Sequence, residues 1–273
     1  MSIRAAAAQS RRIVFNLFAW AVVLLVAFPL FWMIITSLKP ESELFTRPPT
    51  FFPAAYTLEN YERLLFETHF PTFFMNSSIV ALGTTLLVIV VATLGAHSLV
   101  TFRYRGRRLL AQAVLFTYLL PSVILVIPLY MVMARLGLVN SLLGLVICYA
   151  TFALPFALWL LRSFMAAIPI DLESAAMIDG ASRIRAFIDV ILPQALPGII
   201  STALFTFIVA WNEYLFAMVL MNRQLSMTLP VGILTHNINP MTASVMMSVP
   251  LIIAFTFLQK HLTRGFGAGA VKG

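Results

Sequence analysis

Charged residues are spread unevenly along this chain of 273 residues, which alternates long apolar stretches with shorter polar ones. Asp, Glu, Lys and Arg are absent from six stretches, residues 13–38, 71–102, 109–134, 136–161, 190–212 and 224–259. An α-helix needs about 20 residues to cross the hydrocarbon core of a bilayer. The pattern predicts an all-α membrane protein, one transmembrane domain over residues 1–273 whose six transmembrane helices span about 14–37, 74–100, 109–133, 142–162, 198–221 and 241–260.

The composition agrees with an apolar environment. Hydrophobic residues make up 61% of the chain, charged residues 10%, and the mean hydropathy is +0.95. Soluble domains carry about 25% charged residues. The single cysteine, Cys148, lies in an apolar stretch, so a disulfide framework is excluded and the residue is interpreted as a small buried hydrophobe.

The positions of Lys and Arg predict the orientation in the membrane. If the N-terminus is cytoplasmic, the inside segments hold Arg4, Arg11, Arg12, Arg103, Arg105, Arg107, Arg108, Arg162, Arg183, Arg185, Lys260, Arg264 and Lys272. The outside segments then hold only Lys39, Arg47, Arg63, Arg135 and Arg223. Cytoplasmic loops carry an excess of Lys and Arg, so both termini are expected in the cytoplasm. This sorting explains the net charge of +8 without nucleic acid.

The first apolar stretch is expected to stay in the protein as a signal anchor. A basic pair, Arg11-Arg12, precedes it, as in a signal peptide. Its apolar part is longer than a signal-peptide core, and the chain continues Lys39-Pro40-Glu41 without a small-residue cleavage site.

Motifs for chemistry on a substrate are missing from the sequence. It contains no phosphate loop ending in Gly-Lys-Ser/Thr, no H-E-x-x-H and no G-x-S-x-G. The four histidines are scattered, and each is interpreted as a loop or interfacial residue rather than a metal ligand: His69, His97, His236 and His261. The chain is therefore expected to be no enzyme and to hold no cofactor of its own.

One carboxylate falls inside the predicted spans. Glu213 stands in the sequence Trp211-Asn212-Glu213-Tyr214, near the outer end of the fifth span. An ionisable group there is costly and should face the bundle interior or water. Asn212, Glu213 and Tyr214 are therefore candidates for lining a translocation path. The alternative is a structural hydrogen bond between helices, with Asn212 as the neighbour.

Two prolines, Pro121 and Pro128, fall inside the third predicted span. A proline frees a backbone carbonyl and can kink a helix. The two residues are expected either to serve packing and curvature or to shape this span around a cavity.

A polar insert at residues 171–193 separates the fourth and fifth spans. Asp171 and Glu173 stand where the first turn of a helix is expected, and negative charge suits a helix N-terminus. Ala175 and Ala176 are small, so a partner surface can approach closely. Gly180 permits a left-handed turn at the end of this helix.

The second half of the insert predicts another short helix, which starts at Arg183 and Arg185 and ends at Leu192-Pro193. Two short helices joined by a small-residue elbow would form a rigid knob within a cytoplasmic loop at 163–197. The alternative is an amphipathic loop that lies on the membrane surface.

The residue order of this insert resembles the cytoplasmic coupling loop in the membrane subunits of bacterial ABC importers. The consensus there is E-A-A-x-x-x-G, nine residues, and I-x-L-P. In this chain Ala175-Ala176 lead to Gly180, and 190–193 read Val-Ile-Leu-Pro after nine residues. Ser174 stands in the Glu column, and Glu173 lies one residue earlier. Three further features add to the resemblance: the Asn76-Ser77 opening of the second span, the Trp-Asn-acid triplet and the tail at 269–273. With them, the chain is most similar to the smaller membrane subunit of maltose-type sugar systems.

The resemblance implies a multi-pass subunit of the bacterial inner membrane that imports a carbohydrate. Its partners would be a sister permease forming a heterodimer, two ATPase subunits that bind ATP and Mg, and an extracytoplasmic solute-binding protein that meets the loop at about 222–240. The residues implied in coupling to the ATPase are Asp171, Glu173, Ser174, Ala175, Ala176, Asp179, Gly180, Arg183, Leu192 and Pro193.

Other functions stay open on the sequence. The cargo could be a non-sugar solute such as glycerol-3-phosphate or a polyol. A secondary transporter would usually need coupling carboxylates near the bilayer centre, for which Glu213 alone is thin support. A membrane-embedded enzyme is opposed by the missing catalytic groupings.

Overall fold

The computed structural model describes residues 3–44, 46, 48–169, 171–236 and 238–269, and these fold into helices and connecting loops without a β-strand. Two compact units are distinguished: one built from residues 1–68 and 237–248, the other from residues 69–236 and 249–273. An all-helical membrane fold was predicted from the apolar stretches, and the structure confirms the helical class.

The first unit contains α1 (Ile3–Ser37), α2 (Glu41–Leu44), α3 (Glu59–Phe66) and the first turns of α13 (Pro240–Gly269). Polar contacts fix α3 to the end of α1. The amide nitrogen Nδ2 of Asn60 donates to the carbonyl oxygens of Ser37 at 3.1 Å and Lys39 at 2.7 Å. The hydroxyls of Ser37 and Tyr61 are 2.7 Å apart. The segment that follows the first span is therefore held in place by its own side chains.

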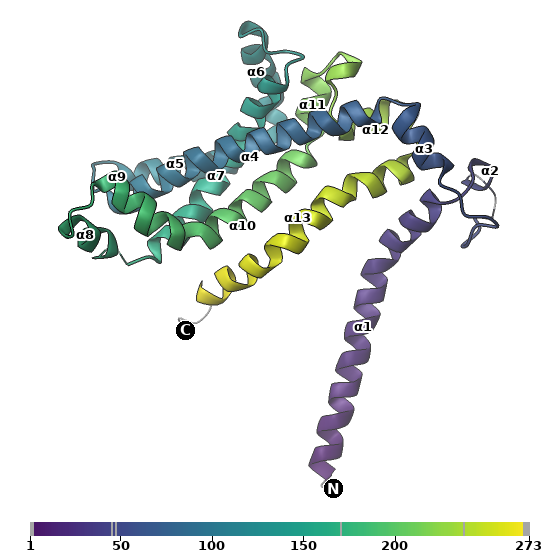
Figure 1. Ribbon diagram of the computed structural model, residues 1–273, viewed down its shortest axis with the longest axis horizontal. Coiled ribbons are helices and arrows are strands. Elements are labelled where there is room, and N and C mark those ends of the chain that lie inside the picture. Colours follow the sequence, from purple (N-terminus) through teal and green to yellow (C-terminus); the bar gives the residue numbers. More distant parts are fainter. Residues whose placement is uncertain (1–2, 45, 47, 170, 237, 270–273) are drawn as a thin grey trace. The chain divides into compact units, whose positions relative to one another are not determined.

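The second unit contains the remaining helices (Figure 1). In chain order they are α4 (Phe70–Thr101), α5 (Arg107–Tyr118), α6 (Ser122–Arg135), α7 (Leu142–Ala166), α8 (Asp171–Ile178), α9 (Arg183–Ala186), a π-helical turn (Phe187–Ile191), α10 (Leu192–Trp211), α11 (Leu215–Leu220), a 3-10 turn (Gln224–Ser226), α12 (Leu229–Thr235) and the part of α13 from residue 249 on. Within this unit α4, α7 and α10 run side by side, with α8 and α9 at one end of them and α11 and α12 at the other.

Small side chains let α4, α7 and α10 pack closely. Their shared core contains Val88, Ala92, Ala96, Ala153, Ala157, Leu161, Met165 and Ala195. A Cβ at Gly198 of α10 would lie 2.5 Å from Cγ of Phe164, so only glycine fits at that crossing. Small residues at helix crossings are the usual means of bringing backbones together in membranes, where apolar burial between helices contributes little.

Five helical segments are long and apolar enough to cross a membrane, Arg11–Ser37, Phe70–Thr101, Leu142–Ala166, Arg183–Trp211 and Pro240–Phe257. The third predicted span, 109–133, is not one straight helix. It is divided into α5 and α6, which meet at an angle of 99° and would make a sixth span if they count as one. Pro121 lies at this break and explains it. A proline has no N–H to donate to the preceding helical turn, and it disfavours helical geometry at the residue before it, Leu120.

The fifth predicted span, 198–221, also differs in its limits. The apolar helix starts well before residue 198 and ends at Trp211. Residues 212–214 interrupt it before the short helix α11 begins. The path candidates thus lie in a helix break rather than within a continuous helix.

Candidate functional site

The end of α8 is closed by a glycine turn. The N–H of Gly180 donates to the carbonyl of Met177 at 3.2 Å, and the N–H of Ala181 donates to that of Ala176 at 3.0 Å. These two bonds form a Schellman motif, in which the residue after the cap is left-handed. Gly180 has φ +92° and is exposed, and a Cβ built there meets nothing within 4 Å. The elbow expected from the sequence is therefore a backbone turn that faces open space.

The second half of the loop begins with a capped helix. Ser182 precedes α9, and its hydroxyl accepts the N–H of Arg185 at 3.3 Å. The helix expected to end at Leu192-Pro193 instead continues through the π-helical turn directly into α10. The π turn widens the ring of backbone atoms before Pro193, so a proline without an N–H is accommodated in the first turn of α10. The loop is thus rigidly continuous with the fifth span.

Most of the predicted coupling residues lie on an exposed surface. Exposed are Asp171, Ser174, Ala175, Asp179, Gly180, Arg183 and Pro193, and Ala176 and Leu192 are half-buried. Glu173 differs from all of these, because only 2% of its surface is accessible. One predicted contact residue therefore points into the protein rather than toward a partner.

Glu173 is held by side chains of α4. Its Oε2 accepts a hydrogen bond from Nε2 of His97 at 3.1 Å and a longer one from the hydroxyl of Thr101 at 3.3 Å. Its other oxygen, Oε1, has no hydrogen-bond partner among the described residues. The expectation that His97 is a loop or interfacial residue is wrong, because it is buried and pairs with this acid. A buried histidine in the last turns of α4 is instead the main partner of the loop's buried acid.

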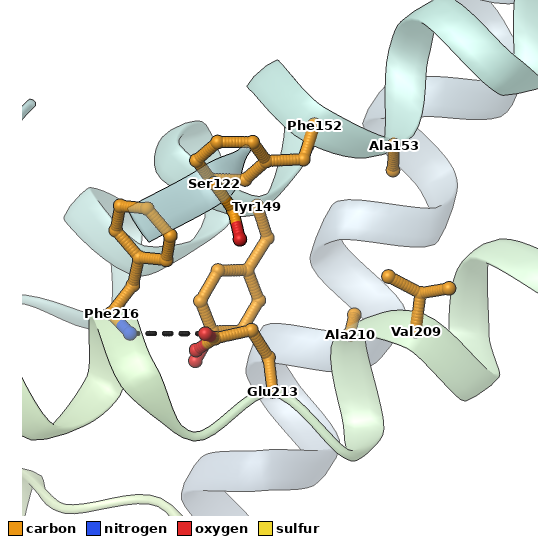
Figure 2. Close-up of a pocket in the computed structure, with 8 residues that line it drawn as sticks. All are labelled: Ser122, Tyr149, Phe152, Ala153, Val209, Ala210, Glu213 and Phe216. Atoms are coloured by element: carbon orange, nitrogen blue, oxygen red, sulfur yellow. Dashed lines mark hydrogen bonds between the residues drawn. The ribbon is translucent and has the colours of Figure 1, made fainter. Parts of the chain in front are cut away.

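One of the path candidates, Glu213, lines a small cavity in the other half of the unit (Figure 2). The cavity has a volume of about 150 Å³, and its lining residues are Ser122, Tyr149, Phe152, Ala153, Val209, Ala210, Glu213 and Phe216. Ser122 begins α6 and Glu213 lies between α10 and α11, so both helix breaks of the unit reach this cavity. The hydroxyl of Tyr149, a residue that is only 3% exposed, is buried and interacts with the carboxylate of Glu213.

Glu213 caps a helix in addition to lining the cavity. Its carboxylate oxygens accept the N–H groups of Phe216 at 3.0 Å and Ala217 at 3.3 Å, which lie in the first turn of α11. Asn212 does not pair with it, because the Asn212 amide donates to the carbonyl of Ile208 in its own helix at 2.8 Å. The structural role of Glu213 is thus to cap α11 rather than to form an interhelical hydrogen bond with Asn212 as the neighbour. Tyr214 is half-buried and does not line the cavity.

The opposite end of α4 holds the loop after α11. The amide of Asn76 donates to the carbonyls of Leu225 and Met227, each at 2.9 Å. The hydroxyl of Ser77 accepts the N–H of Leu229 at 2.8 Å. The Asn76-Ser77 pair, noted in the sequence as a family feature, therefore fixes a neighbouring loop.

Several residues of these sites carry no recognisable motif. His97, Thr101, Tyr149 and Ser122 are single polar residues in apolar surroundings, and only the folded chain brings them beside Glu173 or Glu213. The available signal was their polarity within uncharged stretches. Within the described part of the chain, no group of three His, Cys, Asp or Glu side chains is arranged to hold a metal ion.

Comparison with known proteins identifies relatives over nearly the whole chain. Residues 89–267 match the family described as "Binding-protein-dependent transport system inner membrane component". The diacetylchitobiose uptake system permease protein DasC of Streptomyces coelicolor is 36% identical over 93% of this chain and 95% of its own. The trehalose/maltose transport system permease protein MalG of Thermococcus litoralis is 36% identical over 96% and 98%.

A solved structure shares the fold. It belongs to a bacterial ABC transporter involved in the import of the acidic polysaccharide alginate. The TM-score is 0.82, with 94% of this chain and 98% of the other covered at 24% identity. At that identity the likeness establishes the fold alone.

The capping role of Glu213 predicts a difference between two substitutions. Glu213→Leu removes both acceptors at the start of α11 and should lower the stability of the purified subunit complex by about 1 kcal/mol, the usual effect of losing a helix cap. Glu213→Gln keeps one carbonyl oxygen and should lose less. Thermal unfolding measures both, with Asn212→Ala as the control because that amide bonds only within its own helix. Equal unfolding temperatures for the wild type and Glu213→Leu would rule the cap out as a stabilising contact.

Proposed function

Because this chain belongs to the family of binding-protein-dependent transport system inner membrane components, we propose that it is the permease subunit through which a carbohydrate enters the cell. The protein is a multi-pass inner-membrane component of an ABC transporter and no enzyme, and ATP hydrolysis belongs to separate subunits. Membership implies a partner permease, an ATPase and a solute-binding protein. The observation that supports a carbohydrate as cargo is the 36% identity, over more than nine-tenths of the chain, to permeases of diacetylchitobiose and trehalose/maltose systems.

The assembly proposed is a heterodimer of this chain with a sister permease, above two ATPase subunits that bind ATP and Mg. This chain contributes no cofactor. A binding protein would deliver the carbohydrate from outside, and closure of the ATPase pair would drive the permease pair between inward- and outward-facing states. These steps follow from the family and assign the chain a mechanical role.

The loop at 163–197 is proposed as the contact with the ATPase. Its exposed surface combines the small residues Ser174 and Ala175 with the apolar side chains of Ile178 and Ile184, which are 86% and 73% exposed. Charges stand beside them at Asp171, Asp179 and Arg183. A Schellman turn at one end and a helix cap at Ser182 make the knob rigid. A rigid surface with exposed apolar side chains suits a contact that has to transmit force.

The proposed topology places this loop and both termini in the cytoplasm. The loop lies at the C-terminal end of α4, whereas residues 225–229 lie at its N-terminal end. A helix of 32 residues is about 48 Å long, which exceeds the hydrocarbon thickness of a bilayer. The two loops are therefore far enough apart to lie on opposite sides, which supports the Lys and Arg distribution and an outside position for the segment at 222–240.

The cavity beside Glu213 is proposed as part of the translocation path. A carboxylate and two hydroxyls, those of Tyr149 and Ser122, are presented there next to the rings of Phe152 and Phe216, whose centroids are 4.5 Å apart. Acceptors and donors beside aromatic rings suit a ligand rich in hydroxyl groups. Asn212 and Tyr214 would flank this part of the path without lining the cavity.

The nature of the cargo can be tested through the solute-binding protein that works with this chain. A panel of mono- and oligosaccharides should contain a compound that raises its unfolding temperature, and deletion of this chain should abolish uptake of the same compound. Glycerol-3-phosphate and polyols belong in the panel. Stabilisation by one of these and by no carbohydrate would replace the proposed cargo with the alternative.

Gly180→Val should uncouple transport from ATP hydrolysis. A non-glycine residue at positive φ costs on the order of 1–2 kcal/mol, and the added side chain would occupy the open space where the ATPase is proposed to sit. Co-purification of the ATPase, or hydrolysis stimulated by the loaded binding protein, should fall at least about tenfold.

Gly137→Val is the matched control for this substitution, because Gly137 also has positive φ and open space around its Cβ but lies outside the loop. Normal coupling in Gly180→Val, or equal loss in the two variants, would show that the elbow does not contact the ATPase.

Tyr149→Phe should lower uptake without harming the fold. The hydroxyl that it removes interacts with Glu213, but that carboxylate keeps the N–H groups of Phe216 and Ala217, so the loss leaves it with donors. Losing one hydrogen bond to the cargo should reduce the maximal uptake rate about three- to tenfold. Hydrolysis stimulated by the binding protein should persist. Tyr130→Phe on α6, outside the cavity, is the control, and wild-type uptake in Tyr149→Phe would remove this residue from the path.

A further inference from the structure

His97 contacts both halves of the loop at 171–191. On one side its Nε2 donates to Glu173 of α8 at 3.1 Å. On the other side its ring lies against Phe187, at the start of the π-helical turn, with 4.5 Å between the ring centroids. One side chain of α4 therefore contacts the segments before and after the Gly180 elbow.

The surroundings of His97 leave Glu173 few other partners. The histidine is 8% exposed and its ring also meets Phe102 edge-on at 5.7 Å between centroids. Among the described residues, the hydroxyl of Thr101 is the only other side-chain donor that reaches the carboxylate, at 3.3 Å, and Oε1 has no hydrogen-bond partner there. A buried carboxylate that loses its main donor is strongly disfavoured. The bond to His97 therefore largely determines whether α8 stays on α4.

The same helix carries the contact to the opposite loop. Asn76 and Ser77 bind the backbone of residues 225–229 through three hydrogen bonds. No break interrupts α4 between Ser77 and His97. A displacement of the loop that reaches His97 would therefore move the far loop together with the helix.

We propose that His97 is the positioning residue that ties the ATPase-docking loop to α4, so that the loop, this helix and the segment at 225–229 move as one body. The proposal rests on the docking role of the loop given above. What it adds is the residue through which the movement enters the membrane and the element that carries it across. The role depends on a hydrogen bond donated to a buried carboxylate, and the charge of the imidazole is not required.

The test compares three variants in the complete transporter reconstituted with its ATPase and binding protein. His97→Phe keeps an aromatic ring against Phe187 but donates no hydrogen bond to Glu173. His97→Gln keeps an N–H donor and cannot carry a positive charge. Thr93→Val is the matched control, since Thr93 is buried one turn earlier in α4 and its hydroxyl has no hydrogen-bond partner among the described residues.

In His97→Phe, the ATPase should still co-purify and basal hydrolysis should continue, while stimulation by the loaded binding protein and uptake fall at least about tenfold. His97→Gln should retain most of the stimulation and most of the uptake, and Thr93→Val should behave as the wild type. Full stimulation in His97→Phe, or a defect in His97→Gln as severe as in His97→Phe, would overturn the proposal.

A double variant covers the case in which His97→Phe fails to assemble. Adding Glu173→Leu removes the unpaired carboxylate, so assembly should return while coupling stays lost. Normal coupling in the double variant would show the hydrogen bond to be dispensable and contradict the proposal. Gly180→Val distinguishes failure of this proposal from failure of the proposed docking role. If Gly180→Val uncouples the transporter and His97→Phe does not, the loop docks on the ATPase but His97 is not its link to α4.

Discussion

The hydrocarbon core of a membrane offers no hydrogen-bond partner, so every interruption of a helix there has to be satisfied by the chain itself. This constraint explains the cavity beside Glu213. Two helices of the second unit are interrupted, between α5 and α6 at Pro121 and between α10 and α11 at residues 212–214. The carboxylate of Glu213 satisfies free N–H groups at the second break. The residue that lines the proposed path therefore also lowers the energetic cost of interrupting the helix.

The dual role of Glu213 changes how its substitution has to be interpreted. Loss of transport in a Glu213 variant would not separate the proposed path lining from helix capping, because the same carboxylate lines the cavity and caps α11. Tyr149 separates them, since its side chain lines the same cavity and interacts with Glu213 but caps no helix. Substitution of the neutral residue Tyr149, which no sequence motif marks, is therefore more informative about the path than substitution of Glu213.

The sequence was sufficient where the information is local. Uncharged stretches predicted the helical class, and Gly180 was correctly expected to form a turn, because a Schellman motif depends on a few adjacent residues. It was insufficient where residues distant in the chain meet. Nothing local pairs His97 with Glu173, which are 76 residues apart, or places Tyr149 beside Glu213. The continuation of the loop through Leu192-Pro193 was missed because a π-helical turn, which has no clear sequence signal, accommodates the proline.

The shift of the acidic residue from position 174 to position 173 has a geometric consequence. Successive residues of an α-helix point about 100° apart, so neighbours in α8 face different directions. Glu173 faces α4 and is buried, whereas Ser174 lies on the exposed side with Ala175. A carboxylate at the family's Glu position would be offered to a partner, but here the negative charge is used within the subunit. The docking surface proposed for this loop therefore has a neutral residue, Ser174, at the family's acidic position. The exposed apolar side chains of Ile178 and Ile184, together with the small residues around Gly180, would provide the contact instead.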